Sequence, residues 1–503
     1  MVINQMNQEL MPNFLKKRAF LTPDRIALYF DGQALSFKDL YDKSFETAGR
    51  LTAFGVKKKS FTGILLTNHI DTVFILFALQ LIGARAVMLN NRLSARELEW
   101  QLKDSKTDIV IADASFSVTE SLKRSQLGQC NIVTKEELWS KSAEIFKAEE
   151  EIDLADICTI MYTSGTTGNP KGVIQTYGNH WWSATGSALN LGIMDADCWL
   201  CAVPIFHISG FSILMRSVIY GMSIVLHESF DVLKTLSDIE QKRVTIMSVV
   251  TTMLTRITDY LNGEHLPAHF RCMLLGGGPA PLPLLETCAD FGIPVFQSYG
   301  MTETSSQIVT LAPEYSLAKL GSAGKTLFPS EIKILTTEGK NALPGEAGEI
   351  TVKGPNVTPG YLYREDATKE KFRNGWLHTG DIGYLDEEGF LFVLDRRDDL
   401  IISGGENIYP AELEGILLGH SAVKEAGVIG IPDEKWGQVP AAYVVIRKSA
   451  DVTEEELIEF CSTRMARYKV PKEIHTIEEL PRNAAKKLLR RKLRELWEAG
   501  REK

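Results

Sequence analysis

Cysteine is scarce in this sequence, because 503 residues contain seven cysteines, an odd number spread thinly along the chain. Disulfide frameworks need many closely spaced cysteines, so this count predicts reduced thiols and a cytoplasmic protein. Cys198 and Cys201 form a C-x-x-C pair. No second pair completes a zinc site and no strand-to-helix turn follows, so we interpret both as small apolar residues of a buried strand rather than as a redox pair.

Long apolar runs are missing as well. The most apolar stretch, residues 73–89, is broken by Gln80 and Arg85. It is shorter than the roughly 18 apolar residues that indicate a membrane-spanning helix. The start of the chain also lacks the apolar segment of a secretory signal. We therefore expect neither a membrane span nor a signal peptide.

The chain has no excess of positive charge. Lys and Arg number 55 against 64 Asp and Glu, which gives a net charge of −9. Because nucleic-acid binding needs a broad basic surface, we do not expect a nucleic-acid partner. Anionic small ligands stay compatible with this charge, since local sites hold them. The 44% of hydrophobic and 24% of charged residues are typical of globular proteins, and the length predicts about two to four domains.

Strand-like and helix-like segments alternate through the first 390 residues or so. The expected helices lie at 72–82 and from Ser94, where Ser94 and Glu97 form a capping box. The expected strands lie at 63–66, 86–89, 108–112, 244–250, 273–275 and 293–296. This alternation predicts an α/β fold with parallel or mixed sheets covered by helices. Ligands of such sheets gather at the carboxyl ends of the strands.

The last hundred residues follow a different pattern. A charged, glycine-bearing stretch at 395–405 precedes short elements: a helix from Pro410, strands near 423–429 and 442–446, a helix from Thr453 and a basic helix from about Lys486. We interpret the basic helix as a solvated face rather than as a nucleic-acid or membrane patch. The pattern predicts a large N-terminal domain, residues 1–395, and a small α+β C-terminal domain, residues 396–503.

The sharpest polar signal is TSGTTGNPKG at residues 163–172, after an apolar run at 157–161. Glycines let the backbone approach an anion, hydroxyls and backbone amides donate hydrogen bonds, and a lysine adds charge. The segment does not fit the Walker A pattern, and an ordinary turn needs neither the lysine nor so many donors. We predict a polyphosphate-binding loop formed by Thr163, Ser164, Gly165, Thr166, Thr167, Gly168 and Lys171.

Two segments that follow expected strands add to this signal. The glycines of GGGP at 276–279 let a flat ligand approach the backbone, although a plain turn explains them too. YGMTET at 299–304 offers an aromatic face, a hydroxyl and a carboxylate. A carboxylate beside phosphates normally holds Mg²⁺, whereas Glu303 taken alone is typical of a solvated loop acid.

Three further candidates depend on context. Asp381 ends WLHTGD, which we expect to be a loop, and its carboxylate can accept ribose hydroxyls there. Arg396 can bridge to ribose or phosphate, and the alternative is a surface charge cluster in LDRRDD. His207 lies in the apolar segment PIFHISG, where a histidine is more often a core residue than a catalyst.

Six segments together resemble the adenylate-forming superfamily of acyl-CoA synthetases, adenylation domains and luciferases. They occur in the family's order and spacing: TSGTTGNPKG, PIFHISG, YGMTE, GWLHTGD, LDRRDDLIISGGENIYP and LPRNAAKKLLR. The stretches GNHWWSATGSALNLGI, LLGGGPAPLPLLE and FQSYGMTETSSQIVTL look like the branch of the family that ligates o-succinylbenzoate to CoA in menaquinone synthesis.

The resemblance implies two half-reactions and a mobile C-terminal domain. A carboxylate attacks the α-phosphate of MgATP, which gives an acyl-adenylate and pyrophosphate, and the CoA thiol then attacks the acyl carbon and releases AMP. We therefore expect an ATP-dependent acid–CoA ligase for 2-succinylbenzoate that uses ATP, Mg²⁺ and CoA. A CoA ligase for another aryl or medium-chain acid, a nonribosomal adenylation domain and a nucleotide-binding pseudoenzyme are the alternatives. The sequence leaves the oligomeric state, including a homo-oligomer, open.

The resemblance also implies roles for the residues that match its motifs. Catalysis is assigned to Lys487, Thr302, Glu303 and His207, with Glu303 also ligating Mg²⁺. The nucleotide site includes the loop and Gly277, Gly278, Ser298, Tyr299, Gly300, Asp381 and Arg396. The acid site contains His207, Gly277, Ser306 and Gln307.

The C-terminal roles implied by the family involve few residues. Asp398 is the hinge, and Gly404 and Gly405 lie near the CoA channel. Lys486 stands where the family usually has glycine. The position of Lys487 directly before Leu488-Leu489-Arg490 favours it as the catalytic lysine.

Overall fold

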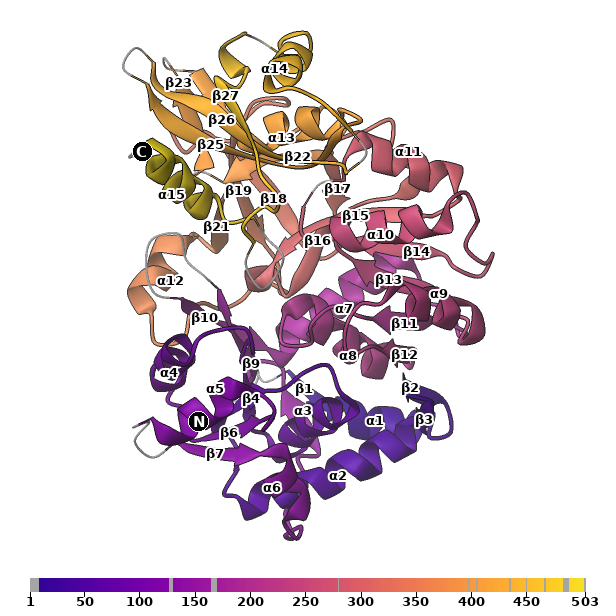
Figure 1. Cartoon of the computed structure of the whole chain (residues 1–503). Coiled ribbons are helices and arrows are strands. Elements are labelled where there is room, and N and C mark those ends of the chain that lie inside the picture. The colour runs from indigo at the N-terminus through magenta and orange to yellow at the C-terminus, as the bar shows by residue number, and fades with distance from the viewer. Residues whose placement is uncertain are drawn as a thin grey trace.

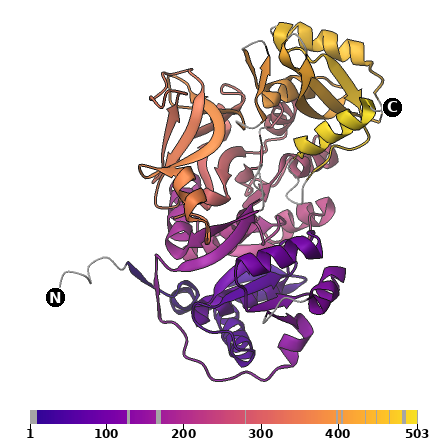
Figure 2. The ribbon, with the colours of Figure 1, turned by 90° about the vertical axis from the view of Figure 1, so that its left-hand side faces the viewer.

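The computed structural model describes residues 9–125, 130–163, 170–278, 280–396, 399–403, 406–433, 436–448, 450–465, 467–482 and 488–501. The chain forms a large N-terminal part built on two main sheets and a smaller C-terminal part (Figure 1). Figures 1 and 2 place the C-terminal part at the opposite end of the molecule from the first sheet. The predicted α/β fold class is confirmed.

The first sheet is mostly parallel. Its strands, in spatial order, are β10 (Lys171–Thr176), β9 (Ile157–Thr163), β5 (Arg85–Met88), β4 (Phe61–Leu65), β6 (Ile109–Ala112) and β7 (Asn131–Thr134). Only the β9–β10 pair is antiparallel among these pairings. The helices around it are α2 (Phe37–Ala53), α3 (Ile70–Ile82), α4 (Ala95–Asp104), α5 (Ser117–Arg124) and α6 (Lys135–Ser140).

Helix α3 explains the most apolar stretch of the sequence. It is buried along almost its whole length and shares one apolar core with strands of both main sheets. Its all-round apolar surface is therefore typical of a core helix. Within the described ranges, no helix is long and apolar enough to cross a membrane. The capping box predicted at Ser94 is present at the start of α4.

The second sheet has a parallel centre and an antiparallel extension. Its strands, in spatial order, are β18 (Glu331–Leu335), β19 (Gly348–Lys353), β21 (Trp376–Leu385), β22 (Leu391–Arg396), β17 (Ser322–Thr326), β16 (Ser306–Leu311), β15 (Val295–Met301), β14 (Cys272–Leu275), β13 (Ile246–Val249), β11 (Cys198–Cys201), β12 (Ser223–Leu226), β2 (Ile26–Phe30) and β3 (Gln33–Ser36), with β20 (Phe372–Arg373) beside β21. The strands from β2 to β15 run parallel, as the alternating sequence predicts.

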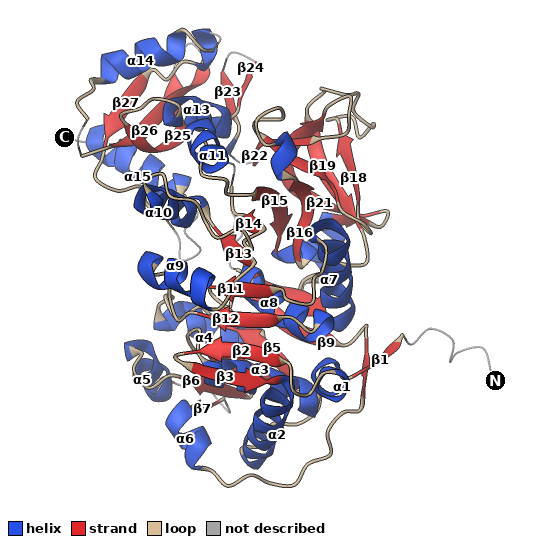
Figure 3. Cartoon of the chain, turned by 90° about the vertical axis from the view of Figure 1, so that its right-hand side faces the viewer, coloured by secondary structure: helices blue, strands red, loops and turns tan. Residues whose placement is uncertain are grey.

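Helices flank the strands of this sheet (Figure 3). They are α1 (Phe14–Leu21), α7 (Tyr177–Leu191), α8 (Ile208–Tyr220), α9 (Val232–Gln241), α10 (Thr251–Leu261), α11 (Leu282–Asp290) and α12 (Glu365–Lys371), and a separate strand pair joins β1 (Leu10–Pro12) to β8 (Glu151–Asp153). Cys198 and Cys201 lie buried on β11, and burial raises the pKa of both thiols to about 12. Both thiols are free, so the structural interpretation of this pair is confirmed.

Two expectations about strands need correction. The strand expected at 293–296 is β15, which extends to Met301, so Tyr299 and Gly300 lie in the strand rather than after it. The segment that ends at Asp381 lies in strand β21 rather than in a loop. In both cases antiparallel neighbours extend the strand, β16 beside β15 and β19 and β22 beside β21. The pairing of the strands, rather than the local residue pattern, therefore sets where β15 and β21 end.

The C-terminal part is a small sheet buried on both faces. Its strands are β24 (Glu406–Ile408), β23 (Ile401–Ser403), β26 (Gly437–Ile446), β25 (Val423–Asp433) and β27 (Glu473–Thr476). One apolar cluster contains Val428 with residues of α13 (Pro410–Leu418) and α14 (Glu454–Ser462). The other contains Ile429 with residues of α15 (Arg490–Arg501). Alternate side chains of β25 therefore face different helices, which is why residues 426–432 of this strand carry no charged side chain.

Candidate functional site

The ends of the predicted phosphate loop are held by an antiparallel strand pair. Thr163 at the end of β9 lies opposite Lys171 at the start of β10. The preceding Tyr162 donates hydrogen bonds from its hydroxyl to the Asp104 carboxylate, at 2.9 Å, and to the Gln101 carbonyl, at 3.1 Å. The site residues Ser164, Gly165, Thr166, Thr167 and Gly168 fall outside the described residues. The structure therefore fixes both flanks of the loop.

Lys171 and Glu303 are brought together through Tyr361. The Lys171 ammonium lies 5.3 Å from the centre of the Tyr361 ring. The Tyr361 hydroxyl donates a hydrogen bond of 3.0 Å to Oε1 of Glu303. The predicted phosphate-binding lysine and the predicted magnesium-binding acid thus flank one aromatic ring, an arrangement that suits a magnesium–polyphosphate complex.

The tight turn between β15 and β16 carries Thr302 and Glu303. Thr302–Thr304 form a single turn of 3₁₀ helix, and Ser306 opens β16. Gly300 is required at the strand end, because a Cβ there would lie 2.1 Å from the Ser306 carbonyl oxygen. This crowding explains the glycine of the YGMTE segment without a direct role in ligand binding.

Tyr299 and Asp381, both predicted to contact the nucleotide, form a second contact. The Tyr299 hydroxyl donates a hydrogen bond of 2.7 Å to Oδ2 of Asp381. In the β21–β22 ladder Asp381 lies opposite Arg396, of which the backbone is described. Strands far apart in sequence therefore bring together the aromatic residue and the acid that the sequence assigned to one nucleotide.

Gly277 and Gly278 face open space beside this pair. The parallel strands β14 and β15 end next to each other, and the Ser298 hydroxyl donates a hydrogen bond of 2.9 Å to the Leu275 carbonyl. Gly277 has φ +86°, a conformation that favours glycine. A Cβ on Gly278 would meet no atom within 4 Å. The glycines therefore leave room at the carboxyl ends of the strands, where ligands of α/β sheets bind.

A buried arginine lies beside the predicted acid site. The Arg216 side chain on α8 is 1% exposed, and its Nη2 lies 3.2 Å from the Ser306 hydroxyl. Its guanidinium also lies 5.1 Å from the centre of the Trp199 ring, while Nε is buried without a hydrogen-bond partner. Burial lowers the pKa of Arg216. Across the described ranges, no carboxylate forms an ion pair with this arginine.

Gln307 is buried at the start of β16, and His207 is half-buried directly before α8. Both amide atoms of Gln307 are buried without a hydrogen-bond partner. Burial, and then the charge of Arg92, lowers the pKa of His207 to about 4. The imidazole is therefore neutral at pH 7, and its Nε2 is buried without a partner. Among described side chains, no hydrogen bond or ion pair joins His207 to Thr302 or Glu303.

Four predicted site residues and Lys486 fall outside the described residues. The four are Asp398, Gly404, Gly405 and Lys487. Asp399, next to the predicted hinge, forms ion pairs with Arg490 at 3.2 Å and Arg494 at 3.5 Å.

Sequence reasoning missed Tyr361 and Arg216. Tyr361 sits in an unremarkable Gly-Tyr-Leu segment and meets Glu303 through tertiary packing alone, so the sequence carried no signal for it. Arg216 did have a signal. It is the one charged residue in the otherwise apolar segment ISGFSILMRSVIY, where burial of a charge is expensive.

The residues around Glu303 fit a magnesium ion that arrives with phosphates. In the described part of the chain, no cluster of three or more His, Cys, Asp or Glu side chains could hold a metal ion. Mg²⁺ binds through one or two carboxylates, substrate phosphates and several waters. A single carboxylate beside a phosphate-binding lysine suits that ion.

Comparisons with known proteins identify related chains. The family model of AMP-binding enzymes matches residues 15–362, and the model of the AMP-binding enzyme C-terminal domain matches residues 412–487. The chain is 55% identical over 490 residues to a 2-succinylbenzoate–CoA ligase from Geobacillus sp. (strain WCH70), which covers 97% of this chain and 98% of the relative.

Solved structures of o-succinylbenzoate CoA synthetase from Bacillus subtilis are also similar. The complex with the acyl-adenylate intermediate OSB-AMP has 52% identity and a TM-score of 0.91, covering 96% of this chain and 98% of the other. The complex with ATP and magnesium ion has 51% identity and a TM-score of 0.91, covering 96% and 100%. A double mutant bound with its product analogue OSB-NCoA has 52% identity and covers 97% and 98%, but its TM-score is 0.75.

Proposed function

Because the chain belongs to the family of AMP-binding enzymes, we propose that it is an AMP-forming acid–CoA ligase that acts on 2-succinylbenzoate. It activates the acid with MgATP as an acyl-adenylate and then transfers the acyl group to CoA, with AMP and pyrophosphate as the other products. Relatives above 50% identity along nearly the full chain support this assignment, and one of them was solved with the acyl-adenylate.

The unpaired Arg216 is the observation that favours a dianionic acid. 2-Succinylbenzoate carries two carboxylates, and only the one on the succinyl chain is activated. The other must be buried with it, and a buried carboxylate costs several kcal/mol unless it is paired. Arg216 supplies a buried positive charge with no carboxylate partner in the described residues, and the unpartnered Gln307 amide lies on the strand that Ser306 opens. An acid with one carboxylate would leave that charge unmatched.

The first half-reaction brings together groups that repel each other. The acid carboxylate and the phosphates are both negative, so the chain must offset this repulsion as the new bond forms. Thr163, Lys171 and the loop between them bind the β- and γ-phosphates. Held by Glu303 and the phosphates, Mg²⁺ supplies further positive charge there. No side-chain nucleophile is needed, because ATP provides the activation.

The nucleotide lies against the ends of β14 and β15. Tyr299 packs on the adenine over the space left by Gly277 and Gly278, while Asp381 and Arg396 hold the ribose. Thr302 contacts phosphate. The hydrogen bond from Tyr299 to Asp381 supports this proposal, because it fixes the aromatic ring and the ribose acceptor relative to each other.

We assign the N-terminal domain to residues 1–395 and the mobile C-terminal domain to residues 396–503, with the hinge at Asp398. Strand β22 of the large sheet ends at Arg396, whereas Asp399 is already tied to α15 by ion pairs, so two residues separate the two bodies. The TM-scores support a change in arrangement. One relative scores 0.91 with the acyl-adenylate and 0.75 with the product analogue, at equal identity and nearly equal coverage.

A hinge at this position gives a direct test. In Asp398→Pro, proline fixes φ near about −65° and prevents the rotation that admits CoA. Thioester formation from preformed acyl-adenylate should fall much more than ATP–pyrophosphate exchange. Equal loss of both half-reactions, or no loss, contradicts a hinge here. Gly404 and Gly405 would face the CoA thiol after the rotation.

Lys487 serves the first half-reaction. Its charge is needed between the incoming carboxylate and the α-phosphate, so Lys487→Ala should lower adenylation by roughly 10²–10³-fold. The same variant should convert preformed acyl-adenylate and CoA to thioester near the normal rate. Lys486→Ala is the matched control, which should harm neither step, because the position directly before Leu488-Leu489-Arg490 assigns catalysis to Lys487. Exchange of the two phenotypes would assign catalysis to Lys486 instead.

The assignment of the acid is tested with purified protein, ATP, CoA and a panel of acids, read by AMP release. We expect kcat/KM for 2-succinylbenzoate to exceed that for benzoate and octanoate by orders of magnitude, because a site built around buried polar groups rejects ligands that leave them unpaired. Equal kcat/KM values for these acids would refute the substrate assignment. We also propose that the protein acts in the cytoplasm, which supplies ATP and CoA and keeps thiols reduced.

A further inference from the structure

The turn that carries Thr302 and Glu303 is held from outside at four successive carbonyl groups. The donors to the carbonyls of residues 302, 303, 304 and 305 are, in that order, Gln175 Nε2 at 2.9 Å, the Thr358 amide at 2.7 Å, Asn356 Nδ2 at 3.2 Å and Ser183 Oγ at 2.6 Å. These donors come from β10, from the segment before α12 and from α7. Three of the four are side chains, so substitution can remove each one separately.

The turn needs this support because its backbone is strained. Ser305 has φ +52° and Ser306 has φ +106°, although neither is glycine. Such conformations cost about 1–3 kcal/mol each and persist only where the surroundings hold them. Removing one donor should therefore let the nearest part of the turn relax, and with it the side chains that this part carries.

Gln175 links the nucleotide end of the turn to the phosphate-loop strand. It lies on β10, four residues after Lys171, and its Oε1 accepts a hydrogen bond of 2.8 Å from the Thr159 hydroxyl on β9. Because the Thr302 carbonyl can only accept, the amide nitrogen of Gln175 must be the atom that faces it, and Oε1 is left to accept from the Thr159 hydroxyl. Both strands of the pair that flanks the phosphate loop thus fix the backbone of the residue next to Glu303.

Ser183 holds the opposite end. Its hydroxyl reaches the Ser305 carbonyl from α7, and the next residue, Ser306, contacts Arg216. The two ends of one short turn therefore carry different tasks. Thr302 and Glu303 face the magnesium–nucleotide complex, while Ser306 and Gln307 belong to the acid pocket.

We propose that Gln175 and Ser183 are positioning residues that set the two halves of the site independently, Gln175 for MgATP and Ser183 for the acid. Neither touches a substrate in this scheme, which rests on the function proposed above. Gln175 keeps Glu303 in register with Lys171, and Ser183 keeps Ser306 in register with Arg216. If these residues contributed only to packing, their substitution would lower stability but would not affect KM for MgATP and KM for the acid differently.

The test compares Gln175→Met and Ser183→Ala in ATP–pyrophosphate exchange. Gln175→Met should raise KM for MgATP and the Mg²⁺ concentration for half-maximal rate by about tenfold or more, since outer residues of metal sites typically contribute 10–100-fold. Its KM for 2-succinylbenzoate should change less than twofold. Ser183→Ala should show the reverse pattern. Equal changes in both KM values, or none, would overturn the proposal.

Two matched variants control for folding. Ser187→Ala removes another buried serine of α7 whose hydroxyl has no hydrogen-bond partner, and it should leave both KM values unchanged. Thr159→Val removes the hydroxyl that donates to Gln175 and also contacts Nε2 of His180 at 3.4 Å, so it should shift KM for MgATP in the same direction by a smaller factor. If Thr159→Val shifts KM for the acid instead, the link through Gln175 is wrong.

Measurements of nucleotide binding test this proposal independently of the substrate assignment. Calorimetric titration with MgATP needs no acid. The affinity for MgATP should be weaker in Gln175→Met and unchanged in Ser183→Ala. Were the wild type inactive with 2-succinylbenzoate but this difference present, the substrate assignment would fail and the role of Gln175 would stand. Equal MgATP affinities in the two variants would refute that role whatever the acid.

Discussion

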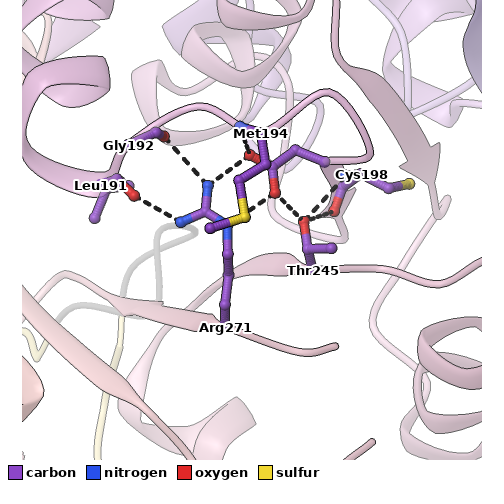
Figure 4. A network of polar contacts seen from close by, with 7 residues as sticks. Leu191, Gly192, Met194, Cys198, Thr245 and Arg271 are labelled. Carbon is purple, nitrogen blue, oxygen red and sulfur yellow. Dashed lines mark hydrogen bonds and ion pairs between the residues drawn. The ribbon is translucent and has the colours of Figure 1, made fainter. Parts of the chain in front are cut away.

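Two arginines of the N-terminal part are held in opposite ways. Arg271, just before β14, donates to the carbonyls of Leu191 at 2.6 Å and Gly192 at 3.2 Å, and to both carboxylate oxygens of Asp197 at 2.8 and 2.6 Å (Figure 4). That carboxylate also accepts a hydrogen bond of 2.7 Å from Thr245. The hydrogen bond with Asp197 raises the pKa of Arg271. Arg216 is more deeply buried and meets a hydroxyl and an aromatic ring instead of a carboxylate.

The difference separates structural charges from functional ones. Arg271 joins the loop after α7 to the start of β14, and every charge in that network is matched within the chain. Arg216 carries its charge into the interior unmatched, and burial lowers its pKa. Folding alone gains nothing from such a residue, because an apolar side chain of similar size would pack at lower cost. An unmatched buried charge therefore indicates a ligand of the opposite sign.

The largest effect should come from breaking the matched pair. Arg271→Met leaves the Asp197 carboxylate, 1% exposed, without its bidentate partner. Removing one partner of a buried pair costs about 3–5 kcal/mol, so the free energy of unfolding should fall by that amount. Urea unfolding followed by circular dichroism measures it, and kcat/KM of the folded fraction should stay unchanged. A loss below about 1 kcal/mol would show that the network does little for stability.

The unmatched arginine should respond in the opposite way. Arg216→Met should leave the free energy of unfolding unchanged or raise it, since it replaces a buried unpaired charge with an apolar chain. The same change should lower kcat/KM for 2-succinylbenzoate by roughly 30- to 10³-fold, about 2–4 kcal/mol, because the spare carboxylate loses its partner. Arg216→Lys keeps the charge but not the planar guanidinium, so its kcat/KM should lie between those of the wild type and Arg216→Met. Unchanged kcat/KM in Arg216→Met would remove the basis for a dianionic substrate.

The charge of Arg216 also affects its neighbour His180. Burial, and then that charge, lowers the pKa of His180 to about 3, from an ordinary value of 6.5. The unfolded chain therefore binds a proton that the folded chain refuses, so stability is complete above pH 6.5 and falls as the pH decreases below it. At pH 5 the loss from this residue should be about 2 kcal/mol.

Urea unfolding at pH 7.5 and pH 5 measures this loss. The variant His180→Asn should lose about 2 kcal/mol less than the wild type between the two pH values. An identical pH dependence in both proteins would mean that His180 is protonated in the folded state.

The smallest effects should come from the hydroxyls beside each arginine. Ser306→Ala removes the hydroxyl that contacts Arg216 and should raise KM for the acid about two- to tenfold, since one hydrogen bond contributes about 0.5–1.5 kcal/mol. Thr245→Val removes a hydroxyl from the Asp197 network and should lower the unfolding free energy by about 1–3 kcal/mol without a kinetic effect. If Ser306→Ala destabilises the fold and leaves KM for the acid unchanged, the surroundings of Arg216 serve stability, as those of Arg271 do, and the proposed distinction fails.

Motifs located most of the nucleotide site because their residues are close in sequence. The strand and lysine around the phosphate loop, the turn with Thr302 and Glu303, and the acid at Asp381 could be found in this way. The partners of these groups could not. Tyr361 reaches Glu303, and Gln175 reaches Thr302, across more than fifty residues of chain. Strand ends were underestimated because pairing with β16 extends β15, and pairing with β19 and β22 extends β21, where the local residue pattern carries no strand signal.

The sequence by itself determined the α/β class, the family and the position of the phosphate loop, because apolar periodicity and short motifs depend on residues near each other in the chain. The tertiary structure decided which charges are matched. Arg216 and Arg271 look alike in sequence, and only the packing of α8, β14 and the loop after α7 gives a carboxylate to one and withholds it from the other. Electrostatic pairing depends on distance through space, which composition and local pattern do not contain.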